Sequence, residues 1–284
     1  MTPTAALRGL LAQRRTACLV GARDALTARI AADAGFDGLW VSSFEVSATL
    51  GLPDLGLLTM SECLDAAARV SAATPMPTLV DCDTGFGDAI NLARATRQFE
   101  ATGVAGICVE DKASPKRNSY LDGDQVLDDP DRFAHRIEAA VRTRDDPDFV
   151  VVARCEALIA GRDMSEALSR AHRYVDAGAD AVLIHSKRRD PDEVVEFLGR
   201  WRSRVPVIVV PTTYHEWTVA EAQDAGVSLV IYANQALRAS VLATRKVLSE
   251  ISLSGHASIA EDSLAPVKEI FDLTRTAEWD EWGE

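Results

Sequence analysis

Short apolar runs recur along the chain and alternate with longer segments that have helical periodicity. Four of these runs come just after a repeated phrase that contains a glycine; the phrase starts at Ala34, Thr102, Ala177 and Ala225. A glycine in this place is typical of the position that follows a helix. Because polar residues do not alternate with apolar ones in the runs, the pattern predicts strands of a parallel sheet buried on both faces.

Four further apolar runs bring the number of predicted strands to eight; they span 17–21, 77–80, 149–153 and 205–210. Helices are predicted to start at two Asp-Pro pairs, with Asp129 and Asp190 as the capping residues. Eight alternating strand–helix units in about 250 residues predict a (β/α)8 barrel, the TIM barrel. A doubly wound sheet is the alternative, but no GxGxxG motif follows the first strand.

Two insertions, 42–58 after the second strand and 111–127 after the fourth, interrupt the regular spacing. Both follow the carboxyl ends of strands, where the active sites of barrels lie. A last apolar-periodic segment, 264–273, comes after the eighth helix. We therefore expect one barrel domain over 1–284, in which 264–284 is a helical extension that caps the barrel or packs onto another subunit.

Composition and charge narrow the class of protein. The net charge is −13 and the basic residues form no long run, which argues against nucleic-acid binding. Five cysteines without CxxC spacing fit reduced thiols better than a disulfide framework. No window approaches 18 uninterrupted apolar residues and the first residues carry no cleavage signal, so we expect a soluble cytoplasmic protein without membrane contact.

Carboxylates stand where two neighbouring strands end. Asp81 and Asp83 follow the run at 77–80, and Glu110 follows the next strand and precedes a polar, basic segment. Oxygen ligands beside a basic loop suit Mg²⁺ that holds an anionic substrate. Asp83 has a second interpretation, as the cap of the following helix.

Other polar residues at strand ends are expected at the same mouth of the barrel. Arg154 either pairs with Glu156 or another carboxylate or clamps a substrate oxyanion, and the clamp is the favoured role. His185 either donates to the same substrate or is a structural histidine. Trp40 and Ser42 follow the second strand. No GxSxG motif supports a serine hydrolase.

The motifs at these strand ends resemble those of a known group, the phosphoenolpyruvate mutase/isocitrate lyase superfamily, and within it the phosphoenolpyruvate mutases and phosphonopyruvate hydrolases. The resemblance runs from Trp40 nearly to the end of the chain, with anchors at 81–87, 109–119, 152–157 and 184–187. It implies a barrel whose last helix swaps between subunits, usually in a homotetramer built as a dimer of dimers. It also implies Mg²⁺, with Mn²⁺ as a substitute, and a small anionic substrate, an α-keto acid or enol phosphate.

The resemblance also implies roles for individual residues. Asp81 would be the direct metal ligand, while Asp83 and Glu110 would hold metal-bound waters. Asp54 matches the family's carboxylate at the reacting phosphorus. The remaining implied site residues contact the substrate or close over it: Trp40, Ser42, Ser43 and Phe44 at the carboxylate end, Arg154 and His185 at charged oxygens, and Lys116, Asn118 and Ser119 in a gating loop.

The gating loop separates the subfamilies. Lyases that cleave 2-methylisocitrate or isocitrate carry a cysteine there, and this chain has none between 116 and 119. Mutases carry Asn where this chain has Asn118, and hydrolases tend to have Thr. The first insertion, with Glu45 and Pro53, is more like the hydrolase.

We therefore expect an isomerase of phosphonate biosynthesis that interconverts phosphoenolpyruvate and 3-phosphonopyruvate by dissociative phosphoryl transfer. Three alternatives stay open. The first is phosphonopyruvate hydrolase, and the second is a carbon–carbon lyase acting on a substituted malate or oxaloacetate. The third is a barrel that only binds a metabolite.

Overall fold

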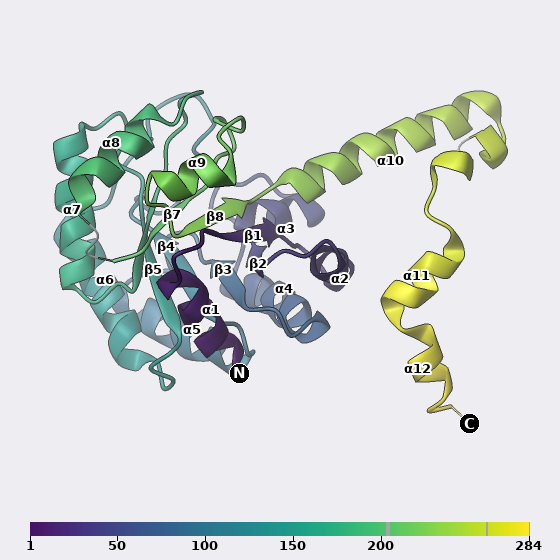
Figure 1. The fold of residues 1–284 in the computed structure, drawn as a ribbon, viewed down its shortest axis with the longest axis horizontal. Coiled ribbons are helices and arrows are strands. Elements are labelled where there is room, and N and C mark those ends of the chain that lie inside the picture. Colours follow the sequence, from purple (N-terminus) through teal and green to yellow (C-terminus); the bar gives the residue numbers. More distant parts are fainter. Residues whose placement is uncertain (203–204, 260, 284) are drawn as a thin grey trace.

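Eight parallel strands close into a barrel in chain order in the computed structural model, which describes residues 1–202, 205–259 and 261–283. Pairing of β1 with β8 completes the ring (Figure 1). This confirms the predicted (β/α)8 barrel. The strands are β1 Ala17–Gly21, β2 Gly38–Val41, β3 Thr78–Asp81, β4 Gly106–Glu110, β5 Val150–Cys155, β6 Ala181–Ile184, β7 Val207–Val209 and β8 Leu229–Tyr232.

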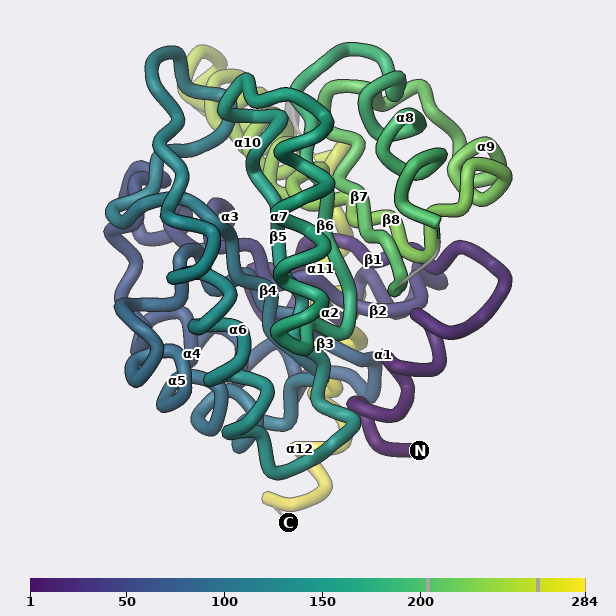
Figure 2. The backbone as a smooth tube through the Cα atoms, turned by 90° about the vertical axis from the view of Figure 1, so that its left-hand side faces the viewer, coloured from purple at the N-terminus to yellow at the C-terminus, as the bar shows by residue number. Residues whose placement is uncertain are grey.

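Helices surround the barrel, and α5, α6 and α7 lie side by side on its outside (Figure 2). Within the described ranges, no helix is both long and apolar enough to cross a bilayer. The α-helices are α1 Pro3–Ala12, α2 Ala25–Asp33, α3 Ser43–Thr49, α4 Met60–Ala73, α5 Ala89–Ala101, α6 Pro130–Thr143, α7 Met164–Asp176, α8 Asp192–Trp201, α9 Val219–Asp224, α10 Gln235–Ser254, α11 Val267–Thr274 and α12 Thr276–Asp280.

The repeated glycine has the predicted role. Gly35, Gly103, Gly178 and Gly226 follow α2, α5, α7 and α9, and their φ angles are 81°, 81°, 102° and 96°. This left-handed backbone ends a helix at little steric cost only when the residue has no Cβ. The four copies of the phrase therefore mark helix–strand junctions.

The predicted element boundaries are less accurate than the elements themselves. The seventh strand is shorter than 205–210, because Pro206 has no N–H to donate to a ladder. The fifth is longer than 149–153, so Arg154 lies within β5 rather than after it. Asp129 caps α6 as predicted, by accepting from two backbone N–H groups. The cap of α8 is Pro191, one residue after the predicted Asp190, and Asp190 accepts from the N–H of Asp192 at 3.3 Å.

The interior of the barrel is packed with apolar side chains below the mouth. Leu19, Leu79, Leu183 and Ile231 belong to one buried cluster with Trp40, which lies at the top of β2. Helix α1 adds Leu7 and Leu11 to this cluster and so covers the amino ends of the strands. The carboxyl ends are therefore the open mouth of the barrel.

The chain leaves the barrel through α10, which projects as a long helix before the chain turns back (Figure 1). The predicted segment 264–273 forms α11, which starts only at Val267 because Pro266 is its cap. Helix α11 lies near α2, where Arg29 donates to the backbone carbonyl of Leu273. The extension thus contains the helices α11 and α12, and position 284 lies outside the described residues. Exchange of this extension between subunits stays a prediction.

Candidate active site

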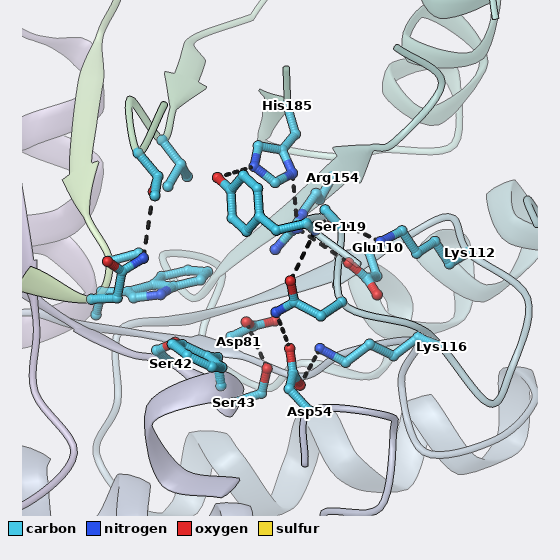
Figure 3. Close-up of a pocket in the computed structure, with 18 residues that line it drawn as sticks. Ser42, Ser43, Asp54, Asp81, Glu110, Lys112, Lys116, Ser119, Arg154 and His185 are labelled. Carbon is cyan, nitrogen blue, oxygen red and sulfur yellow. Dashed lines mark hydrogen bonds and ion pairs between the residues drawn. The ribbon is translucent and has the colours of Figure 1, made fainter. Parts of the chain in front are cut away.

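A cavity of about 200 Å³ opens at the carboxyl ends of the strands (Figure 3). Both insertions contribute to its wall, as do the ends of β2 to β8. Every residue predicted for the site lines this cavity except Asp83, which forms an ion pair with Lys116. The lining residues are Trp40, Ser42, Ser43, Phe44, Asp54, Asp81, Glu110, Lys112, Lys116, Asn118, Ser119, Tyr120, Arg154, His185, Val210, Thr212, Ala233 and Asn234.

The first insertion begins with a capped helix at the floor of the cavity. Ser42 is the N-cap of α3 and accepts from the N–H of Glu45 at 3.4 Å. Ser43 donates its hydroxyl to Oδ2 of Asp81 at 2.9 Å. Ser42 and Ser43 are both buried, so this short turn is fixed by its own cap and by the carboxylate of β3.

Three buried carboxylates lie at the ends of β3 and β4. Asp81 accepts from the N–H of Asp83 at 3.2 Å, and the carbonyl of Asp83 accepts from the N–H of Glu110 at 2.8 Å. Burial raises the pKa of all three carboxyl groups, although Lys116 opposes the effect at each of them. Asp83 does not cap the following helix, because Asp88 is the N-cap of α5.

The carboxylates fit a hard divalent cation that is bound partly through water. Oε1 of Glu110 is buried and has no hydrogen-bond partner in the structure. In the described part of the chain, no three His, Cys, Asp or Glu side chains converge as direct ligands of one ion. The direct and water-mediated ligand roles expected for Asp81, Asp83 and Glu110 stay a prediction.

The second insertion folds over the cavity and contacts the first (Figure 3). Nζ of Lys116 lies 2.5 Å from Oδ1 of Asp54 and 3.0 Å from Oδ1 of Asp83. Asn118 donates its side-chain amide to Oδ2 of Asp54 at 2.6 Å. Burial lowers the pKa of Lys116, but Asp83, Glu110 and Asp54 outweigh burial and raise that pKa above its usual value. Lys116 is therefore a fixed positive charge beside Asp54.

The base of this loop is anchored on the barrel. The N–H of Asp128 donates to the carbonyl of Asp111 at 2.9 Å, which joins the two ends of the insertion. Nη1 of Arg170 donates to Oδ2 of Asp111 at 3.2 Å and to the carbonyl of Asp128 at 3.1 Å. Tyr174 also donates to Oδ2 of Asp111, at 2.6 Å. Helix α7 thus holds both ends of the loop.

Arg154 forms the predicted ion pair with Glu156. Its Nε donates to Oε1 of Glu156 at 2.6 Å, and its Nη2 lies 3.4 Å from Oε2 of Glu110. It also lines the cavity, and its role as a clamp for a substrate oxyanion stays a prediction.

Glu156 does not line the cavity, but it contacts four residues that do. Its two oxygens contact Arg154, Lys112, Ser119 and His185, and the distance to Nδ1 of His185 is 2.7 Å. Burial would raise the pKa of Glu156, but Arg154, His185 and Lys112 lower it well below its usual value. The side chain is therefore a carboxylate. Burial lowers the pKa of His185, which favours a neutral imidazole.

Four polar residues of the cavity were missed from the sequence: Lys112, Tyr120, Thr212 and Asn234. Thr212 and Asn234 follow β7 and β8, so the rule that identified Asp81 and His185 applies to them as well. Lys112 and Tyr120 lie in the second insertion, and the sequence gives no signal for the direction of their side chains.

Comparisons with known proteins identify the family of this chain. Phosphonopyruvate hydrolase of Variovorax sp. (strain Pal2) is 42% identical over 275 residues, which cover 96% of this chain and 95% of that protein. Phosphoenolpyruvate phosphomutase of Tetrahymena pyriformis is 39% identical over 271 residues, or 95% of this chain and 90% of that protein.

Solved structures give the same two names. A phosphoenolpyruvate phosphomutase from Streptomyces platensis subsp. rosaceus superposes with a TM-score of 0.96 and 46% identity, covering 98% of this chain and 97% of that one. A phosphonopyruvate hydrolase in complex with oxalate and Mg²⁺ has a TM-score of 0.93 and 39% identity, covering 99% and 98%. The family model described as phosphoenolpyruvate phosphomutase matches residues 7–252. The chain therefore belongs to the phosphoenolpyruvate phosphomutase family, within the phosphoenolpyruvate mutase/isocitrate lyase superfamily.

Proposed function

We propose that this enzyme is a mutase that interconverts phosphoenolpyruvate and 3-phosphonopyruvate. The observation that carries the proposal is the contact of Asn118 and Lys116 with Asp54 inside the closed cavity. An amide donor and an ammonium beside one carboxylate suit a site that holds a transferring phosphoryl group. The 46% identical structure named as a phosphomutase supports the same reaction.

Mg²⁺ would be held by Asp81, with Asp83 and Glu110 acting through water. Its charge would stabilise the pyruvate enolate that forms when the phosphoryl group leaves. The structure with oxalate and Mg²⁺ supports this choice of metal, and Mn²⁺ would serve through the same oxygen ligands. Arg154 also lines the cavity and would supply a fixed positive charge to the substrate's oxygens.

In the mutase direction toward 3-phosphonopyruvate, the O–P bond of phosphoenolpyruvate breaks and the bonding electrons stay on the enolate. Asp54 holds or accepts the phosphoryl group, and Lys116 balances the negative charge that gathers there. Carbon 3 of the enolate then takes the phosphoryl group and forms the C–P bond. The carboxylate end of the substrate would lie against the turn at Ser42, Ser43 and Phe44, where the first backbone N–H groups of α3 have no carbonyl partner within the helix.

Exclusion of water favours transfer over hydrolysis. Lys116 and Ser119 are 6% and 3% exposed, so the second insertion buries its own polar side chains when it covers the cavity. Water that reached the phosphoryl group would release inorganic phosphate. The closed loop therefore serves the proposed isomerisation.

Phosphonopyruvate hydrolase is the second candidate. The 42% identical relative carries that name, and Glu45 and Pro53 of the first insertion resemble the hydrolase pattern. A lyase is less well supported, because the described lining of the cavity includes no cysteine that could act as the general acid.

We also propose a homotetramer in which the extension packs onto a neighbouring subunit. Apolar side chains are exposed along the extension, with Leu242 at 69%, Val267 at 66% and Trp279 at 75%. Light scattering after size-exclusion chromatography tests the assembly, and a monomeric mass would contradict it.

The reaction is tested by ³¹P NMR with purified protein, Mg²⁺ and phosphonopyruvate. A phosphate-ester resonance from phosphoenolpyruvate is the expected first product. Inorganic phosphate as the first product would identify a hydrolase. In a separate assay with a substituted malate or oxaloacetate as the substrate, release of glyoxylate or pyruvate would identify a lyase.

A further inference from the structure

Tyr120, at the tip of the second insertion, contacts His185 inside the cavity. Its hydroxyl lies 3.3 Å from Nε2 of His185, and the two rings meet edge-on at 90° with centroids 5.9 Å apart. The Tyr120 hydroxyl is therefore held against the residue that follows β6.

The other nitrogen of His185 defines the tautomer of the ring. Nδ1 lies 2.7 Å from Oε1 of Glu156, which is a carboxylate and can only accept. A bare lone pair on Nδ1 at that distance would be repelled, so Nδ1 carries the hydrogen and donates it. Nη2 of Arg154, which can only donate, lies 3.0 Å from the same Nδ1, but the contact with the carboxylate is shorter and assigns the hydrogen to Nδ1. Nε2 then has a free lone pair, which accepts from the Tyr120 hydroxyl.

A neutral histidine with Nδ1–H on a buried carboxylate has the arrangement of a general base. Its Nε2 faces the cavity that also contains Asp54, Lys116 and Asn118. A water molecule at Nε2 would be activated for attack on the phosphoryl group. A mutase needs no such base, because no proton moves during the transfer.

We propose that the Tyr120 hydroxyl occupies Nε2 of His185 and thereby suppresses hydrolysis, which makes Tyr120 a residue that determines the specificity of the reaction. This inference rests on the proposed mutase function. Tyr120 belongs to the loop that covers the cavity, so closure of this loop also places the hydroxyl at Nε2 of His185 and blocks the base. Its backbone N–H also donates to Oδ1 of Asn118 at 2.9 Å, which ties it to the residue that holds Asp54.

The suppressed reaction is the addition of water to phosphonopyruvate. The water oxygen forms a bond to phosphorus and gives its proton to Nε2 of His185. The P–C3 bond breaks and its electrons stay on the enolate of pyruvate, which then takes up a proton at carbon 3. The products are inorganic phosphate and pyruvate, and the proton on His185 returns to solvent.

The test compares product ratios by ³¹P NMR for the unaltered enzyme, Tyr120→Phe and the double variant Tyr120→Phe/His185→Gln. Removal of the hydroxyl is expected to raise the ratio of inorganic phosphate to phosphoenolpyruvate about 100-fold or more, the lower end of general-base effects. The double variant should lose this gain because glutamine is no base. Tyr232→Phe, on a ring outside the cavity that packs edge-on against Phe36, is the matched control and should keep the original ratio.

Each outcome is informative. An unchanged ratio in Tyr120→Phe, with phosphoenolpyruvate still formed by the unaltered enzyme, overturns the inference and leaves the mutase intact. Phosphate that persists in the double variant means that water enters through a looser loop, which also overturns it. Phosphate as the only product of the unaltered enzyme overturns the proposed function, and the inference with it, since an intact hydroxyl would not have prevented hydrolysis.

A measurement on the unaltered enzyme covers the case in which Tyr120→Phe does not fold. The ¹⁵N chemical shifts of His185 distinguish a protonated nitrogen from an unprotonated one, and His185→Gln assigns the signals. Protonated Nδ1 with unprotonated, hydrogen-bonded Nε2 is expected. Protonated Nε2 would overturn the inference.

Discussion

The side-chain amide of Asn118 donates to Oδ2 of Asp54 at 2.6 Å, across 64 positions of sequence. This bond joins the two insertions, which otherwise belong to different strand–helix units of the barrel. Asp54 is only 9% exposed, so the contact lies inside the cavity rather than at its rim. The site is therefore complete only when both insertions are in place.

Asp54→Ala is expected to reduce turnover by at least about 100-fold, the effect of losing a well-placed charged group at the reacting atoms. Asp54 is not among the expected metal ligands, so Mg²⁺ should still bind. ³¹P NMR measures the loss of turnover, and calorimetry measures whether Mg²⁺ still binds. Appreciable residual isomerisation would remove Asp54 from the reaction.

Asn118→Thr is expected to increase the release of inorganic phosphate from phosphonopyruvate. The shorter threonine side chain cannot reproduce the amide contact with Asp54, and the phosphoryl group would be held less firmly. The ratio of phosphate to phosphoenolpyruvate is the measurement. If Asn118→Thr keeps the product ratio of the unaltered enzyme, the loop does not decide the reaction.

Removal of the metal is expected to stop the reaction. Prolonged dialysis against a chelator should abolish turnover, and added Mg²⁺ or Mn²⁺ should restore it. The same addition should raise the melting temperature, because the ion relieves repulsion among Asp81, Asp83 and Glu110 in the folded state. Full turnover after removal of the metal would contradict the expected cofactor.

Glu156→Gln is expected to destabilise the fold by about 3 to 5 kcal/mol, the usual cost of removing one partner of a buried ion pair. The change leaves Arg154 and Lys112 buried without their carboxylate, and both lie on the wall of the cavity. Urea unfolding at one fixed protein concentration measures the loss. Asp65→Asn, which removes an exposed ion pair with Arg69, is the control and should change stability little.

Glu45 gives a stability that depends on pH. The side chain is fully buried, Oε1 accepts from the N–H of Leu237 at 3.2 Å, and burial raises the pKa of Glu45 from 4.5 to about 7. A carboxyl group with a raised pKa in the folded state stabilises the fold while it is protonated. That contribution is present below pH 4.5 and is lost as the pH rises through 7.

Glu45→Gln removes this dependence because glutamine does not titrate. Between pH 4.5 and 8, the unfolding free energy of the unaltered protein should fall by about 3 kcal/mol relative to that of the variant. Denaturant unfolding of both proteins across this range measures the difference. Parallel curves would mean that Glu45 is not titrating in the folded protein.

The sequence identified the barrel and most of the site because both depend on local patterns. Apolar runs and the glycine at each helix end define the strands, and polar residues directly after a strand lie at the mouth end of the barrel. Arg154 was recognised on this basis even though the end of its strand was misplaced. Thr212 and Asn234 obey the same rule and were overlooked.

The second insertion marks the limit of such reasoning. The direction of Tyr120 follows from its contact with His185, which is distant in the sequence, and from the anchoring of Asp111 by Arg170. No local periodicity encodes these contacts. The same holds for Glu156, which has four partners from the second insertion and from β5 and the residue after β6.

The contacts that hold the second insertion over the cavity, from Lys116 and Asn118 to Asp54, are made between protein atoms alone. A lid that the protein itself latches is open for only a fraction of the time, and ligands meet the binding-competent form in that fraction. Capture of substrate should therefore level off at high substrate concentration, at the rate with which the latch opens. Product leaves through the same opening, so the rate at which the loop opens would limit both substrate binding and product release.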